Sequence, residues 1–268
     1  MFTFAGKLHI NNFSCIMANV IKIKKGLDIN LKGKASDVLL NGGKSDSYAI
    51  VPDYYNGIVP KVVAKVGEKV KAGSVLMIDK NRPEIKFVSP VSGEVTAVNR
   101  GEKRKVLSIV VKPDAQIEYE EFGKKNVASL QGAEVKEVLL NAGMWPFIKQ
   151  RPYDIVAAPL DTPRDIFVSA FYSAPLAPNF DFIVKGQEAD FQTGLNALAK
   201  LTNGKVYVGV RSGSVVSGMK GVEIVEVEGP HPAANVGVQI NHIKPVNKGE
   251  VVWTVNPADV IVIGRLFN

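Results

Sequence analysis

The stretch KFVSPVSGEVTAVNRGEKRK, from Lys86 to Lys105, decides the fold of the first half of the chain. It contains an apolar strand, the turn Ser-Pro-Val-Ser-Gly, a second strand and Gly-Glu-Lys. Residues 51–112 show the same alternation of apolar and polar residues, with glycines between the segments, which predicts an all-β domain. VVAKVGEK (62–69) repeats the strand and the Gly-Glu-Lys turn, so we expect Gly67 and Gly101 to provide the backbone of two tight turns.

This order of elements resembles swinging-arm carrier domains, which bear biotin or a lipoyl group on a lysine at a hairpin tip. The tip is expected near Arg82, and Lys80 and Lys86 flank it. Asp79-Lys80 resembles the lipoyl pair but comes slightly too early, and Pro83 would distort the outgoing strand. We therefore expect a docking or structural module, with a carrier as the alternative.

From about residue 130 the pattern changes to alternating helices and strands. Helices are predicted over 135–143, ending on Gly143, and over 188–201, where apolar residues recur with the helical period. Strands are predicted at 165–171, 181–185, 205–210, 222–227 and 260–263. Strands separated by helical segments indicate an α/β layer with a largely parallel sheet. A further short basic strand and a turn are predicted within 18–30.

Composition excludes several classes of site. The only cysteine, Cys15, cannot form an internal disulfide, a cysteine zinc site or an iron–sulfur cluster. The histidines His9, His231 and His242 are scattered, so we expect no metal site. No apolar run approaches the roughly 20 residues that span a bilayer as a helix. The net charge of +7 is compatible with an acidic partner, anionic lipid or nucleic acid, and equally with an ordinary mildly basic protein.

No catalytic constellation is predicted, because the sequence contains neither a nucleophile elbow nor convincingly paired carboxylates. Trp145 and Phe147, in GMWPFIKQRP (143–152), are either an aromatic ligand wall or ordinary core anchors. His231 lies between two prolines in GPHPAANVGV (229–238). It is either a functional residue that accepts a proton or forms a hydrogen bond, or a structural residue that caps a neighbouring element in a rigid loop.

Several stretches in this order closely resemble the A subunit of the sodium-translocating NADH:quinone oxidoreductase. They are IKIKKGLDI (21–29), the barrel motif (86–104), GMWPFIKQRP, GKVYV (204–208), EGPHPAANVGVQINHIKPV (228–246) and WTVNPADVIVIGRLF (253–267). The resemblance covers residues 17–268. It implies an α/β fold, α+β overall, in which a biotinyl/lipoyl-like barrel-sandwich domain precedes a Rossmann-like α/β domain similar to the flavin subunit of respiratory complex I.

The resemblance also suggests how the chain is divided. We expect a disordered extension over 1–16, a strand and loop segment over 17–50, the barrel-sandwich domain over 51–115 and the α/β domain over 116–268. Members of the family continue well past Phe267, so the chain is expected to be truncated.

In function, the resemblance implies a bacterial inner-membrane complex that uses NADH, flavins, an iron–sulfur centre and quinone to export sodium ions. This chain is expected to be a peripheral subunit on the cytoplasmic face, inactive alone. Its partners would be the other five subunits, with quinone as a candidate ligand and no nucleic acid. Its role would be in assembly and in shaping the quinone-reaction end.

The resemblance further implies that the chain binds no cofactor or metal of its own. The relative in complex I binds flavin with a Gly-Gly-Ala-Gly-Phe-Pro loop, whereas here Met144 and Trp145 occupy the comparable positions. Trp145, Phe147, His231 and His242 are the candidate quinone-side or interface residues. Two alternatives are a stand-alone biotinyl/lipoyl-type carrier or group-transfer protein and an electron-transfer subunit with its own cofactor.

Overall fold

The computed structural model describes residues 19–33 and 36–268. The extension expected over 1–16, which includes His9 and Cys15, lies outside these residues.

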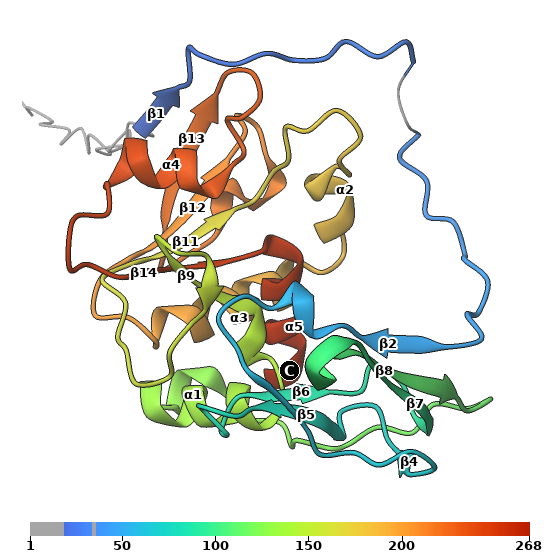
Figure 1. Cartoon of the computed structure of the whole chain (residues 1–268). Helices are drawn as coiled ribbons and strands as arrows, with labels where there is room; N and C mark the ends of the chain where they lie inside the picture. Colours follow the sequence, from blue (N-terminus) through green and yellow to red (C-terminus); the bar gives the residue numbers. More distant parts are fainter. Residues whose placement is uncertain (1–18, 34–35) are drawn as a thin grey trace, which may run out of the picture.

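A mixed seven-stranded sheet forms the centre of the second half, in the order β1–β13–β12–β11–β14–β9–β10 (Figure 1). The first five strands in this order run parallel, and β9 and β10 form an antiparallel edge. The largely parallel sheet predicted from the sequence is therefore confirmed. The strands are β1 (Asn19–Lys22), β9 (Ile148–Arg151), β10 (Ile155–Val156), β11 (Ile166–Ser169), β12 (Val206–Val210), β13 (Glu223–Glu228) and β14 (Val252–Val255).

Helices cover both faces of this sheet. The helices are α1 (Gly132–Asn141), α2 (Phe180–Val184), α3 (Glu188–Ala199), α4 (Val236–Ile243) and α5 (Pro257–Phe267). On one face α3 and α5 pack very closely, because a Cβ at Gly264 would lie 1.7 Å from the carbonyl oxygen of Asp190. On the other face Ile240 of α4 packs against Phe167 and Val252. Their neighbours in the strands point to the opposite core, as strand alternation requires.

The predicted helices over 135–143 and 188–201 are confirmed as α1 and α3, but two predicted strands are wrong. Residues 181–185 lie largely in α2, where Asn179 accepts a hydrogen bond from the Asp181 N–H and caps the helix. Residues 260–263 lie in α5, which Asn256 caps in the same way. Both runs are short and mainly apolar, with buried residues at Val184 and at Val260, Ile261 and Ile263, and such a helix cannot be distinguished from a strand by periodicity alone.

The first half forms the predicted all-β domain. A four-stranded sheet, β2–β8–β7–β4, accompanies a three-stranded sheet, β3–β5–β6, and every pairing is antiparallel. The strands are β2 (Tyr48–Ile50), β3 (Pro60–Val62), β4 (Lys69–Val70), β5 (Val75–Asp79), β6 (Lys86–Val88), β7 (Gly93–Arg100) and β8 (Val106–Pro113).

The two expected glycine turns differ. Gly67 has a φ of +86°, as predicted, whereas Gly101 has a φ of −97° and is extended. The chain reverses after Gly101, in the turn over Glu102–Arg104, where Lys103 and Arg104 take positive φ angles. The two Gly-Glu-Lys sequences therefore belong to turns of different geometry.

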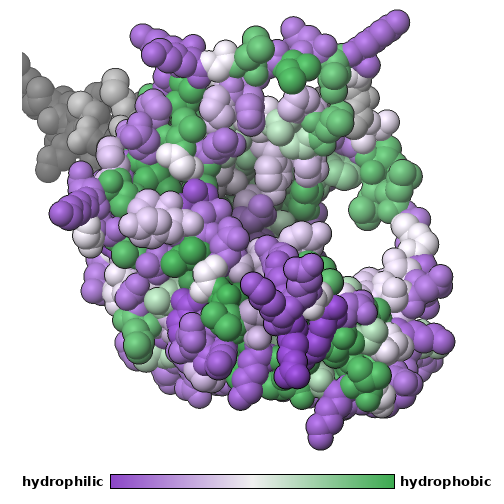
Figure 2. Space-filling model, in the orientation of Figure 1, coloured by the Kyte–Doolittle hydropathy of each residue, from purple (hydrophilic) through white to green (hydrophobic). Residues whose placement is uncertain are grey.

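The N-terminal segment connects the two domains. β1 pairs in parallel with β13 in the α/β sheet, while β2 joins the barrel. The described residues between them run along the outside of the molecule, and Figure 2 shows a hydrophobic group on this stretch. The exposed large apolar residues of this stretch are Leu27, Ile29, Leu31, Val38, Leu39 and Leu40. None of the helices over the described residues is long and apolar enough to cross a membrane.

Candidate functional site

A cavity of about 750 Å³ opens where β11 and β14 end. Its other walls are β9, the first turns of α4 and α5, and Tyr54 and Tyr55 in and beside the short helix η1 (Pro52–Tyr54) of the barrel. Ligands of open α/β sheets bind beyond the carboxyl ends of the parallel strands, and cavities of this size accommodate small molecules. This is therefore the best-placed cavity for a ligand in the described part of the chain.

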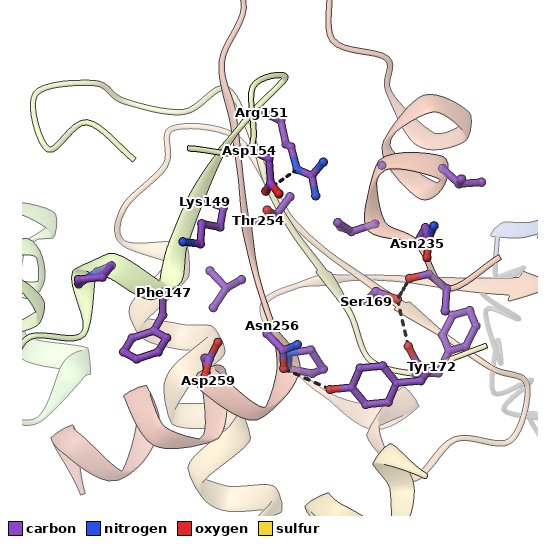
Figure 3. A pocket seen from close by; sticks show the side chains of 18 of the residues that line it. Phe147, Lys149, Arg151, Asp154, Ser169, Tyr172, Asn235, Thr254, Asn256 and Asp259 are labelled. Atoms are coloured by element: carbon purple, nitrogen blue, oxygen red, sulfur yellow. Dashed lines mark hydrogen bonds and ion pairs between the residues drawn. The ribbon is translucent and has the colours of Figure 1, made fainter. Parts of the chain in front are cut away.

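Charged side chains lie along this cavity in a definite order (Figure 3). Lys149 and Arg151 are two residues apart on β9 and so point to the same face of the sheet. Arg151 lies at one end, where its Nε is 3.4 Å from Asp154 Oδ1. Asp259, in the first turn of α5, lies at the other end beside Phe147. The cavity thus contains an Arg151–Asp154 ion pair at one end and the Asp259 carboxylate at the other.

Aromatic rings form the wall at the Phe147 end. The ring centroids of Tyr55 and Phe147 are 6.5 Å apart with an edge-on geometry. The Lys149 Nζ lies 5.2 Å from the centroid of Tyr55, within the range of a cation–π interaction. The Tyr172 hydroxyl donates to Asn256 Oδ1 at 3.2 Å. This end can therefore accommodate a flat, largely apolar group.

Burial changes the acidity of the charged groups in the cavity. It raises the pKa of Asp259 to about 6, and the nearby Lys149 ammonium only partly offsets this effect. Burial also lowers the pKa of Lys149, opposed by the charges of Asp154 and Asp259. No ion pair within 4 Å joins Lys149 to a carboxylate of the described residues. Both groups are thus partly desolvated without a direct charged partner.

We expect the Asp259→Asn variant to be more stable than the parent protein at pH 7.5, by about 2–3 kcal/mol. The carboxyl has a pKa of about 6 in the folded chain, against an ordinary value of 3.8. The folded state therefore holds this proton more tightly, and stability falls as the pH rises from about 4 through 6. Urea unfolding at several pH values would show a difference that shrinks to about 0.5 kcal/mol near pH 4 and vanishes below about pH 3. Equal stability of the two proteins at pH 7.5 would contradict this expectation.

The four residues proposed from the sequence do not meet in one place. Phe147 lines the cavity, whereas Trp145 is fully buried, donates from Nε1 to the Ala157 carbonyl at 2.8 Å and packs edge-on against Trp253. Its geometry is that of a core anchor. His231 and His242 lie outside the residues that line the cavity.

Each of the two histidines makes a local contact. His231 Nδ1 is 3.0 Å from the Ser173 hydroxyl, and its backbone N–H donates to Asp28. His242 is exposed on α4, where its Nδ1 lies 2.8 Å from the Val238 carbonyl. These contacts fit the interpretation of His231 as part of a rigid loop.

Sequence reasoning missed Lys149, Arg151, Tyr172 and Asp259. Signals existed for three of them. Lys149 and Arg151 follow the aromatic Trp-Pro-Phe with the two-residue spacing of a strand face. Asn256-Pro257 is a helix-start signal that would have placed Asp259 in a first turn. No local signal identifies Tyr172, which reaches the cavity through the chain fold.

The hairpin tip expected to bear a carrier lysine is held against the rest of the molecule. Arg82 donates to Asp79 at 2.7 Å, to the Gly57 carbonyl at 2.7 Å and to the Val156 carbonyl at 3.2 Å. Lys86 donates to Asn141 Oδ1 at 2.8 Å, while Lys80 is exposed. A swinging arm needs a free tip, and this one is docked.

Clusters of potential metal ligands are absent from residues 19–33 and 36–268. No group of three or more His, Cys, Asp or Glu side chains in these residues is arranged to hold an ion.

Comparisons with known proteins match both halves of the chain. Residues 21–114 match the family model described as the NqrA N-terminal barrel-sandwich hybrid domain, and residues 130–268 match the NqrA second alpha/beta domain. The chain is 40% identical over 253 residues to the A subunit of the Na(+)-translocating NADH-quinone reductase of Hahella chejuensis. It is 38% identical over 252 residues to the corresponding proteins of Photorhabdus laumondii and Neisseria meningitidis.

These alignments cover 92% of this chain and 56% of each relative. The chain therefore spans about half the length of the curated relatives that it matches.

Proposed function

The chain belongs to the NqrA family, the A subunits of the Na⁺-translocating NADH-quinone reductase, and on that basis we propose that it is a peripheral, non-catalytic subunit of such a complex. The complex would couple NADH oxidation and quinone reduction to sodium export, and the chain would dock on its other subunits at the cytoplasmic face of the membrane. Its own contribution would be to the assembly of the complex and to the shape of the part of the complex where quinone reacts.

The single observation that best supports a non-catalytic role is the packing of residues 143–147. Gly143 is used for contact between the domains, because a Cβ there would lie 2.5 Å from Val88 of the barrel. Trp145 fills the core behind it. A flavin phosphate needs several glycines whose backbone it can approach closely, and this segment offers none free for that purpose. The residues present do not fit a flavin at this loop.

We also propose that the α/β domain is Rossmann-like and related to the flavin subunit of complex I, and that the domains divide near residues 115 and 116. The parallel sheet with helices on both faces supports the first proposal. The end of β8 at Pro113 and the start of α1 at Gly132 support the second.

The positions of the candidate quinone-side or interface residues support different roles. Phe147 faces a cavity, which supports a ligand contact, whereas the buried position of Trp145 supports a structural role. His242 is exposed and so suits an interface with another subunit.

Two measurements on protein purified from its own host test the cofactor-free proposal against its alternatives. We expect the purified chain to be colourless, because neither a flavin loop nor a cysteine cluster is present. We also expect an intact mass that matches the bare sequence, because the hairpin tip is docked. Near-stoichiometric flavin absorbance would favour the electron-transfer alternative. A biotin or lipoyl adduct on Lys80 or Lys86 would favour the carrier.

A further inference from the structure

We propose that the cavity beyond β11 and β14 reversibly binds a mononucleotide, with its phosphate at the Arg151 end and its base at the Phe147 end. This binding does not depend on the proposed subunit role, and of the loop over 143–147 it involves only Pro146 and Phe147, not the glycine and tryptophan positions compared with the flavin loop.

The Arg151 end has the properties of a phosphate position. The Arg151 side chain makes no hydrogen bond to the described residues, and its buried Nε is only 3.4 Å from Asp154. The first turn of α4 approaches it closely, since a Cβ at Gly237 would lie 3.9 Å from Arg151 Nη1. Asn235, which precedes α4, makes no side-chain cap bond to this turn. A guanidinium with free Nη groups beside uncapped backbone N–H groups suits a phosphate oxygen.

The opposite end has the properties of a base position. Tyr55, Phe147 and Tyr172 provide ring faces and edges for stacking a flat heterocycle. Asp259 is the acceptor there for a ring or amino N–H, and its side chain makes no hydrogen bond or ion pair with the described residues. Lys149 lies between the two ends and can donate to the sugar or the phosphate. Along the cavity, the anion site comes first, then Lys149, then the aromatic wall with its acceptor. This order matches the phosphate, the sugar and the base of a mononucleotide.

The chain allows a matched set of variants. Arg151→Gln removes the charge at the phosphate position. Gly237→Leu fills the cavity, and its Cβ meets only Arg151 Nη1 within 4 Å, so the helix backbone is not obstructed. Lys61→Gln, at an exposed position on β3 outside the cavity, is the control for loss of one positive charge.

The test is isothermal titration calorimetry of the 268-residue chain with GMP, AMP, guanosine, adenosine and inorganic phosphate. At least one nucleotide should bind saturably at one site per chain, at least about tenfold more tightly than its own nucleoside or phosphate alone. Arg151→Gln should weaken that binding at least about tenfold, Gly237→Leu should abolish it, and Lys61→Gln should leave it unchanged. Circular dichroism would establish that each variant is folded.

Three results would overturn the proposal. They are the absence of saturable binding of both nucleotides at millimolar concentration, a nucleoside that binds as tightly as the nucleotide with the same base, and equal affinity of the parent protein and Arg151→Gln for the nucleotide that binds. Flavin absorbance of the purified chain bears on the cofactor-free proposal alone, so the two proposals can fail separately.

Discussion

Replacing Trp145 with alanine is expected to lower the free energy of unfolding by about 3–5 kcal/mol, which is a large share of the stability of a typical domain. Trp145 is fully buried and packs edge-on against Trp253, with 5.4 Å between the ring centroids. Alanine would leave a cavity under the sheet and remove the donor to the Ala157 carbonyl. Both losses act on the same position, so the effect should fall at the upper end for a core substitution.

Urea unfolding followed by circular dichroism measures this effect. Tyr153→Ala is the control, because the Tyr153 side chain is 78% exposed and its loss should change stability by less than about 0.5 kcal/mol. Trp145→Phe keeps most of the volume and should cost less than Trp145→Ala. A loss of less than about 1 kcal/mol in Trp145→Ala would mean that Trp145 is not a core anchor, and would reopen its interpretation as a ligand wall.

Replacing Arg82 with methionine is expected to cost about 3–5 kcal/mol as well, because it leaves a buried carboxylate without its charged partner. The Asp79 side chain is only 1% exposed and accepts from Arg82 Nε at 2.7 Å. The same guanidinium donates to the Gly57 carbonyl within the barrel and to the Val156 carbonyl, and the second bond ties the barrel hairpin to the α/β domain. Its removal should therefore weaken the barrel and free its tip.

Thermal unfolding and limited proteolysis together test this second expectation. Lys80→Met, at the exposed position two residues earlier, is the matched control and should behave like the parent protein. The double variant Asp79→Asn/Arg82→Met should recover part of the loss, since no buried charge remains. If Arg82→Met is as stable and protease-resistant as Lys80→Met, the tip is not docked in solution. That result would favour the alternative of a biotinyl/lipoyl-type carrier.

The sequence predicted the fold class because its two halves carry different periodicities. Strand alternation around Lys86–Lys105 and helical spacing over 188–201 both correspond to elements of the structure. It could not predict the pairing of β1 with β13, since these strands lie about two hundred residues apart and only the assembled sheet brings them together. The run over 260–263 was misassigned because its one exposed side chain, Val262, is apolar, so the run shows no polar position that would reveal the helical period.

The candidate site was predicted only in part, for a similar reason. Phe147 was named from an aromatic cluster, which is a local feature. Asp259 is a candidate site residue only because burial raises its pKa beside Lys149. That burial depends on how the barrel packs beside α5, which the local sequence does not reveal. Trp145 shows the converse, because a single sequence does not reveal whether an aromatic side chain faces a core or a ligand.

Membrane association offers the most direct test of the proposed subunit role. The two basic clusters, Lys22, Lys24 and Lys25, and Lys103, Arg104 and Lys105, are exposed, but Lys22 and Lys105 already pair with Glu228 and Asp53. Exposed basic residues contribute about 1 kcal/mol each near anionic lipid, and salt screens them. Such clusters assist docking but do not anchor a protein firmly.

The measurement is fractionation of the native host, with the protein quantified in the membrane and soluble fractions after a high-salt wash. The chain should remain with the membranes when the integral subunits of the sodium-translocating reductase are present, and should move to the soluble fraction when their genes are deleted. Salt-resistant membrane binding in the deletion strain, or a soluble protein in the parent strain, would contradict the proposed role of docking on membrane partners.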